Sequence, residues 1–411
     1  MSHYRREFLF IDEGQNKFHE LVHYWQQAGT TFGAYQMIGH LIINKALNIA
    51  LRKHIKHKGM DLPLTSDNID GLFKDLPEDS QAKKVFDLSQ SLFSKESEDS
   101  LNRLTRIPES PHIFYSGNLD SNMSPYLKAT GTMGYKIGAL SVMEFHNYVI
   151  SKSMDQGYVG RAFEETLFKL ISQVFGKGFE RQIAFICDWA LMVPNKHWTQ
   201  RKIAKEEFHP GWRLLLSLER LNRENIRLQD YQNYDDLVDI ITGTSNWIGR
   251  EETLLQYERY IEFTHSTSQN KNDANRNRQS YRLIEHLIKT AYMARQFKSD
   301  MFALPHLNEE ELYRRLPPLA IRRGNSLFLS IKEDLKSGYL TYITSLAHLK
   351  QIYSGRYSIQ CFYHYLKITG SCKYFKSADL NDENCFAFPG NSTEKYIDCP
   401  FIEFWETWLL K

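Results

Sequence analysis

The chain has 411 residues, of which 42% are hydrophobic and 24% are charged, and its formal net charge is +2. This length exceeds what one hydrophobic core usually serves, so two or three domains are expected. The near balance of charge excludes a polybasic binder of the histone type, and no apolar run reaches the roughly 18 residues that a membrane span needs. The first residues carry no apolar run of signal-peptide length, and we therefore expect a cytoplasmic protein that does not enter a membrane.

Two helices are predicted within residues 16–58. In the second, Ile38, Leu41 and Ile42 begin an apolar stripe whose members recur three and four residues apart. Basic residues charge the last turn of this helix, and Gly59 ends it.

The middle of the chain is also predicted to be mainly helical. Residues 77–127 mix short helical patterns with breaks, and the apolar run at 183–187 fits a buried helix or a strand equally well. Clearer helical patterns occupy five further stretches: 132–153, 158–175, 211–228, 234–242 and 250–265.

Residues 266–279 are polar and contain no large apolar side chain, which predicts a flexible loop or linker. A strong helix is expected from Ser280 to about Phe297, and strand is plausible in the alternating pattern after residue 319. The expected fold is mainly α, with a helical bundle followed by further helical layers and some β structure near the C-terminus. The expected divisions are a helical bundle at 1–150, a helical domain at 151–265, the linker at 266–279, and a helical to mixed domain at 280–411.

The chain has five cysteines, four of them after residue 360, and no Cys-x-x-Cys pair. The odd number and the wide spacing argue against a disulfide framework. Reduced, buried cysteine is the default expectation, and a zinc site among the four C-terminal cysteines stays open.

The N-terminal segment resembles HEPN domains, which are small four-helix ribonuclease and nucleotide-binding bundles. The likeness lies in a long helix over 35–51 with Gly39-His40 and Lys45-Ala46-Leu47, a basic end at Gly59, and a second helix over 68–76. It covers about 60 of the 411 residues.

Catalytic HEPN domains carry an Arg followed, after four to six residues, by a His. The resemblance therefore implies that Arg52 and His57 are catalytic, with the His moving a proton and the Arg stabilising phosphate charge. The alternative is a solvated basic helix end, because two other Arg/His pairs in the chain have a similar spacing.

Arginines cluster in three places and predict a surface that binds nucleic-acid phosphates. The alternative is intrahelical ion pairing with Glu219 and Glu224, which lie among the first group. The predicted nucleic-acid-binding residues are Arg213, Arg220, Arg223, Arg227, Arg276, Arg278, Arg282, Arg322 and Arg323.

Two acidic patterns offer other chemistry. Asp235, Asp236 and Asp239 spell an Asp-Asp-x-x-Asp box, but no second metal box follows it, and acidic residues at a helix start explain it equally well. Asp188 follows an apolar run as in restriction-type nucleases, but no Glu-x-Lys follows at a suitable place.

The motifs for nucleotide hydrolysis, dinucleotide-dependent redox chemistry and serine esterases are absent, and zinc proteolysis is not expected either. No metal site and no cofactor are predicted. We expect a nucleic-acid-associated subunit of a bacterial antiviral defence or mobile-element assembly, with HEPN-type ribonuclease activity. Its expected partners are RNA or DNA and other protein subunits, and the alternatives are a non-catalytic helical scaffold or a metal-dependent nuclease.

Overall fold

The computed structural model describes part of the chain. The described residues are 10–12, 17–58, 83, 114–116, 126–128, 135–154, 157–194, 205–245, 247–270, 275–303, 309–323, 326–339 and 341–343. The helices in this part are α2 (Lys17–Gly29), α3 (Thr31–Lys58), α7 (Ala139–Met154), α8 (Ala162–Phe175), α9 (Glu180–Leu191), α10 (Pro210–Arg223), α11 (Tyr234–Ser245), α12 (Arg250–Gln269), α13 (Asn275–Phe297) and α14 (Glu309–Arg315). The strands are β1 (Phe10–Asp12), β2 (Phe114–Ser116), β3 (Tyr126–Lys128), β4 (Tyr135–Lys136), β5 (Ala320–Arg323) and β6 (Ser326–Leu329).

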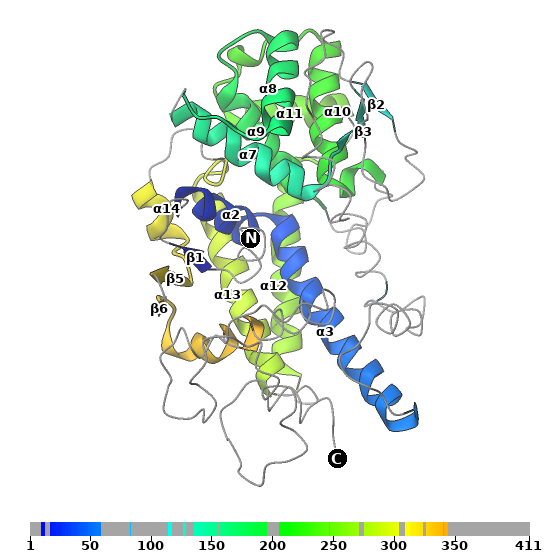
Figure 1. Cartoon of the computed structure of the whole chain (residues 1–411), viewed down its shortest axis with the longest axis vertical. Coiled ribbons are helices and arrows are strands. Elements are labelled where there is room, and N and C mark those ends of the chain that lie inside the picture. Colours follow the sequence, from blue (N-terminus) through cyan, green and yellow to red (C-terminus); the bar gives the residue numbers. More distant parts are fainter. Residues whose placement is uncertain are drawn as a thin grey trace.

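Helices dominate the described residues, which confirms the predicted mainly-α fold. Figure 1 shows α7 to α11 gathered at one end of the molecule, while α12, α13 and α3 run from there toward the other end. Helix α2 lies between these two groups and packs against both α7 and α13. Residues from the start of the chain are thereby placed beside residues from its middle and from its second half.

Two small sheets accompany the helices. β1 pairs in parallel with β5, and β5 pairs antiparallel with β6, so strand structure after residue 319 is confirmed. In the second sheet, whose order is β2-β3-β4, β2 and most of β3 lie where short helical patterns and breaks were predicted, and β4 lies at the start of the helix predicted over 132–153. Strands of two or three residues are too short to show an alternating pattern in the sequence.

Helix α9 settles the ambiguous apolar run at 183–187 as helix. All residues from 182 to 191 are buried, because α7, α10 and α11 surround this helix. A helix that is buried on every side has no polar face, and so its sequence lacks the periodicity that would identify it.

Both ends of the loop predicted over 266–279 are helical, because α12 continues to Gln269 and α13 begins at Asn275, while residues 271–274 lie outside the described part of the chain. The two helices pack along each other, and small polar residues fill part of their contact. The hydroxyl of Thr264 donates to the carbonyl of Tyr260 (2.8 Å), and that of Ser268 donates to the carbonyl of His265 (2.8 Å). These internal hydrogen bonds let polar side chains be buried without a large apolar group.

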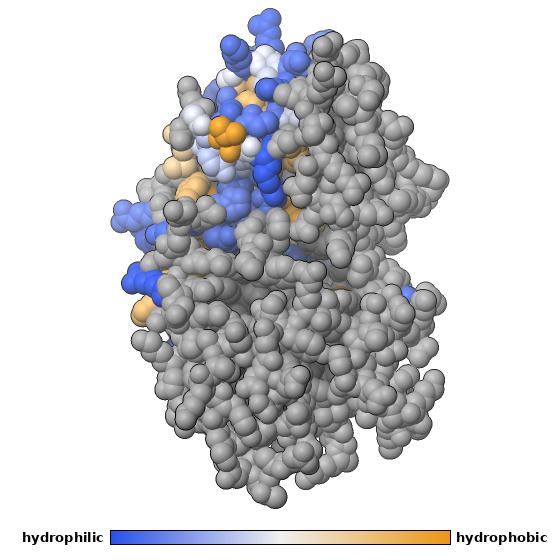
Figure 2. All heavy atoms as spheres, in the orientation of Figure 1, coloured by the Kyte–Doolittle hydropathy of each residue, from blue (hydrophilic) through white to orange (hydrophobic). Residues whose placement is uncertain are grey.

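One hydrophobic cluster of the described residues extends from Ile11 to Ile343. In the described part of the chain, no helix is both long enough and apolar enough to cross a membrane. Figure 2 shows that the described residues visible on this face are mostly hydrophilic, with scattered apolar side chains. The predicted division into domains remains a prediction.

Candidate metal centre

Two histidines on α2 and a glutamate on α7 converge at one point. His19 and His23 are four residues apart, which places both side chains on one face of α2. Glu144 comes from α7, which packs against that face. The ligand atoms of the three side chains all lie within 4.8 Å of one another.

The ligand atoms are close enough to reach one metal ion. The two imidazole Nε2 atoms are 3.1 Å apart, while Glu144 Oε2 lies 3.6 Å from His19 Nε2 and Glu144 Oε1 lies 3.5 Å from His23 Nε2. Zinc binds nitrogen and oxygen ligands at about 2.0–2.2 Å. Each histidine therefore has one carboxylate oxygen of Glu144 beside it.

A buried amide fixes the orientation of His23. Its Nδ1 donates to Oε1 of Gln26 (2.7 Å), and the amide nitrogen of Gln26 donates to the carbonyl of Met143 (2.9 Å). With the proton on Nδ1, the Nε2 of a neutral ring carries a lone pair, which is the form that binds a metal and which here lies 3.2 Å from Nδ2 of Asn147. Such an outer hydrogen bond is a usual companion of metal-binding histidines.

The same amide also reaches His146 on α7. Its nitrogen lies 3.1 Å from His146 Nδ1, and the Nε2 of that ring donates to the carbonyl of Ala303 (3.1 Å). Burial lowers the pKa of His146, and the nearby charge of Arg295 lowers it further against the opposing effect of Asp188. His146 is therefore a neutral, fixed support for Gln26.

Arg161 holds the carboxylate of Glu144 from the opposite side. Its guanidinium lies 2.8 Å from Glu144 Oε2 and also donates from Nε to Glu164 (2.8 Å). Arg161 precedes the first turn of α8, where Glu164 accepts from the backbone nitrogen of Arg161 in a capping box. The start of α8 thus positions a cation beside the candidate ligand.

The trio is buried on one side and open on the other. The side chains of His23 and Glu144 are 0% and 1% exposed, whereas those of His19 and Arg161 are 27% and 39% exposed. A bound metal would be reached past His19 and Arg161.

The expectation of no zinc-protease motif and no metal site overlooked a pattern in the sequence. Residues 19–23 read His-Glu-Leu-Val-His, which is the His-Glu-x-x-His pattern of zinc metalloproteases. In that pattern the two histidines bind zinc and the intervening glutamate, here Glu20, is the general base. Glu20 is buried. The third ligand, Glu144, has no such local signal, because only the packing of α7 on α2 brings it to the site.

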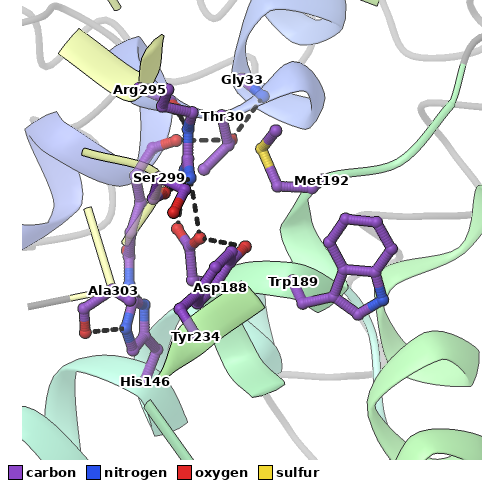
Figure 3. Close-up of polar contacts among 12 residues, drawn as sticks. Thr30, Gly33, His146, Asp188, Trp189, Met192, Tyr234, Arg295, Ser299 and Ala303 are labelled. Carbon is purple, nitrogen blue, oxygen red and sulfur yellow. Dashed lines mark hydrogen bonds and ion pairs between the residues drawn. The ribbon is translucent and has the colours of Figure 1, made fainter. Parts of the chain in front are cut away.

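Figure 3 shows a buried ion pair between Asp188 and Arg295. The carboxylate of Asp188 accepts from both terminal nitrogens of Arg295 (2.9 and 2.8 Å) and from the hydroxyl of Tyr234 (2.9 Å). The nuclease role considered for Asp188 is wrong, because its oxygens are occupied by these donors and its side chain is 1% exposed. Asp235, from the acidic box, pairs with Arg250 (2.8 Å) at the start of α12.

Arg213 does not belong to a nucleic-acid-binding surface. Its side chain is fully buried, donates to the carbonyl of Trp189 (2.9 Å) and lies over the rings of Trp189 and Trp247. Burial lowers the pKa of Arg213 to about 10, against the raising effect of Glu207. The arginine spacing on α10 could not distinguish this core residue from its surface neighbours.

The other predicted arginines are spread over several elements. Arg220 lies over the ring of Trp247 (4.5 Å), and Arg223 pairs with Glu219 (2.8 Å), which is the ion pair that the alternative interpretation expected. Arg323 lies over Phe328 (5.4 Å) on the β5-β6 hairpin. The remaining residues lie as follows: Arg227 just before the 3-10 turn at Leu228–Asp230, Arg276, Arg278 and Arg282 on α13, and Arg322 on β5.

Arg52 and His57 lie in the last turns of α3, in agreement with their predicted helical placement. Their side chains fall outside the described part of the protein, as do the second helix of the HEPN-like layout and the four C-terminal cysteines. The HEPN resemblance and the roles that it implies stay predictions.

Comparison with protein-family models, with curated proteins and with solved structures finds no match to this chain, and so the metal centre has to be interpreted from its own residues.

Proposed function

We propose that the protein is a zinc-dependent hydrolase that cleaves peptide bonds. His19, His23 and Glu144 are the zinc ligands, and Glu20 is the general base. The observation that carries this proposal is the meeting of a His-Glu-x-x-His helix with a carboxylate from a distant helix, with the three ligand atoms within 4.8 Å of one another.

The ligand set favours catalysis over a structural role. Structural zinc sites use four protein ligands, whereas catalytic sites use three and leave the fourth position for water or substrate. Two histidines and one glutamate are among the ligand sets of zinc peptidases. The partial exposure of His19 leaves a route to the fourth position.

The residues around the ligands then have distinct tasks. Zinc held here would polarise the scissile carbonyl and lower the pKa of a water molecule. Glu20 would accept the proton of that water and pass it to the leaving amine. Gln26 would hold the His23 ring, and Arg161 would hold the carboxylate of Glu144.

The first test is the metal content of the full chain. Purified protein supplied with zinc should hold about one ion per chain, and His23→Asn should lose it. The matched control is His286→Asn, which replaces an exposed histidine on α13 that does not belong to the trio, and should keep the zinc. Equal zinc content in the wild type and in His23→Asn would refute the ligand assignment.

The second test separates catalysis from binding. Cleavage of a mixed peptide library should be stopped by a zinc chelator and restored by added zinc. Glu20→Gln should retain the zinc and lose activity by about 100-fold or more, as expected for a general base. A Glu20→Gln variant as active as the wild type would leave a zinc site without the proposed mechanism, and no cleavage of any peptide would refute the function.

A further inference from the structure

A pocket of about 590 Å³ lies away from the metal centre, where the first turns of α9, α11 and α12 meet the end of α13. This volume is within the range of sites for small molecules. Its wall includes Tyr234 and Arg295, whose contacts with Asp188 are drawn in Figure 3. These buried contacts give the pocket a fixed inner wall.

Cationic side chains outnumber carboxylates in the lining. Arg181, Arg250 and Lys298 line the pocket together with Arg295, whose charge is already balanced by Asp188. The carboxylates in the lining are Asp235, paired with Arg250, and Asp300, 3.7 Å from Lys298. One cation is left over, and Arg181 makes no ion pair with any residue that the structure describes.

Two guanidinium nitrogens in the lining have unused hydrogen-bonding capacity. The Nε atoms of Arg181 and Arg250 are buried and have no hydrogen-bond partner within the protein. The guanidinium of Arg181 lies over the ring of Phe185 (5.4 Å), which fixes its position without using its donors. A fixed guanidinium at a pocket, without a carboxylate paired to it, favours an anion there.

Two of the helices that meet here also lack a side-chain cap. Phe179 precedes α9 and Gly249 precedes α12, and neither residue provides a side-chain hydrogen bond to the first turn of its helix. The first backbone N–H groups of a helix and its dipole both favour an anion. Acidic residues occupy these first turns, Glu180 in α9 and Glu251 and Glu252 in α12, and so the positive charge of the pocket comes from its arginine and lysine side chains.

An aromatic ring completes the lining. Phe297, the last residue of α13, lies at the pocket and is 60% exposed, which is unusual for so large an apolar side chain. The guanidinium of Arg315 lies 3.8 Å from the centre of this ring. An exposed, positioned ring offers a stacking surface to a planar group.

We infer that this pocket binds a small organic phosphate that carries a planar ring, with adenosine monophosphate as the simplest probe. Arg181 and Lys298 contact the phosphate, and Phe297 contacts the ring. This inference does not depend on the zinc proposal, because the two sites share no residue.

The test is calorimetric titration of the full chain with adenosine monophosphate, adenosine and inorganic phosphate, with and without EDTA. Adenosine monophosphate should bind at one saturable site, and each of the other two compounds should bind at least about tenfold more weakly. EDTA should not change the affinity for adenosine monophosphate, because the pocket does not need the zinc ion. The result therefore tests the pocket separately from the zinc site. The inference is overturned if adenosine monophosphate shows no saturable binding at millimolar concentration, or if adenosine binds as tightly as the nucleotide. If inorganic phosphate binds as tightly as the nucleotide, the proposed contact between Phe297 and the ring is refuted.

Substitutions locate the site. Arg181→Gln should weaken binding about tenfold or more, as for a lost hydrogen bond to a charged group. Lys298→Gln, at a side chain that is 53% exposed, should weaken binding too without affecting folding. The control is Lys289→Gln on α13, at a half-exposed side chain outside the pocket, which should bind adenosine monophosphate as the wild type does. Circular dichroism shows whether each variant is folded. If Arg181→Gln is unfolded, the affinity of Lys298→Gln decides the test. Folded variants that bind adenosine monophosphate as tightly as the wild type refute the site.

Discussion

At the scale of single residues, Asp188 and Arg295 form a buried pair in which every contact is charge-assisted. Both side chains are 1% exposed, and Arg295 also donates to the carbonyls of Gly29 (2.8 Å) and Ser299 (2.9 Å). These bonds join the end of α2 to α9 and α13. Burial raises the pKa of Tyr234, and the charge of Asp188 adds to this effect, so that its hydroxyl stays a donor to Asp188.

Asp188→Asn should lower the free energy of unfolding by about 3–5 kcal/mol, because it leaves the Arg295 charge buried without its partner. Glu219→Gln, which breaks the more exposed pair with Arg223, should cost about 0–1 kcal/mol. Urea denaturation followed by circular dichroism measures both variants. Similar midpoints for the two would show that the buried pair is not a main contributor to stability.

His146 predicts a pH dependence of folding. Its pKa is lowered in the folded protein, while the unfolded chain has the ordinary value near 6.5. Below about pH 6.5 the unfolded state therefore binds a proton that the folded state does not, and stability falls as the pH decreases. The loss begins near pH 6.5 and continues until the pH reaches the lower folded pKa.

The measurement is the free energy of unfolding between pH 7.5 and 5.5 in the wild type and in His146→Gln. The variant should show a shallower loss of stability over this window, whatever its stability at neutral pH. Identical slopes in the two proteins would assign the pH dependence to other groups.

At the scale of elements, the junction of α2 and α3 is the tightest turn near the metal centre. The hydroxyl of Thr30 donates to the carbonyl of Gln26 (2.6 Å) and accepts from the backbone nitrogen of Gly33 (3.1 Å), so that one side chain links the two helices. A Cβ atom at Gly33 would lie 1.8 Å from the carbonyl oxygen of Gln27. This close backbone approach explains why glycine is needed there.

Gly33→Ala should destabilise the protein by more than about 2 kcal/mol, since the backbone must move to make room. Gly243→Ala in α11 is the matched control, because its Cβ would meet nothing within 4 Å, and it should stabilise the helix by about 0.5–1 kcal/mol. Thermal unfolding compares the two variants. A Gly33→Ala protein as stable as the wild type would contradict the described junction.

Sequence patterns predicted the amphipathic elements well and the others poorly. Helix α8 shows an apolar stripe and ends at Gly176, whose φ of 86° needs glycine, and both features were readable. The strands β2 to β4 and the ends of α12 and α13 were missed because very short strands and buried hydroxyls leave no hydrophobic period. Arg213 shows the same limit, since spacing does not reveal which face of a helix is covered.

At the scale of the whole molecule, two of the three proposed metal ligands could be predicted from the sequence. His19, Glu20 and His23 form a local pattern, whereas Glu144 lies about 120 residues further along and becomes a ligand only through packing. The buried position of Asp188 was likewise hidden, because its partner Arg295 is on another helix.

Nucleic-acid binding stays a prediction for the molecule, now without Arg213. Binding of RNA or DNA should weaken as salt increases, with log affinity falling by about 0.7 to 0.9 per phosphate contact for each unit of log salt. Changing Arg220, Arg223 and Arg227 together to Ala should weaken binding in a fluorescence anisotropy titration. A salt-independent signal, or none, would refute the prediction.

Because its ligands lie on α2 and α7, the proposed zinc ion would link the N-terminal part of the chain to its middle. An ion that binds only the folded arrangement stabilises it in proportion to the logarithm of its concentration relative to its Kd. That stabilisation acts on the contact between α2 and α7, because no other described element supplies a ligand. Loss of zinc would therefore loosen α2 before it affects the pairing of α12 with α13, and the amide hydrogens of α2 would be the first to exchange faster with solvent.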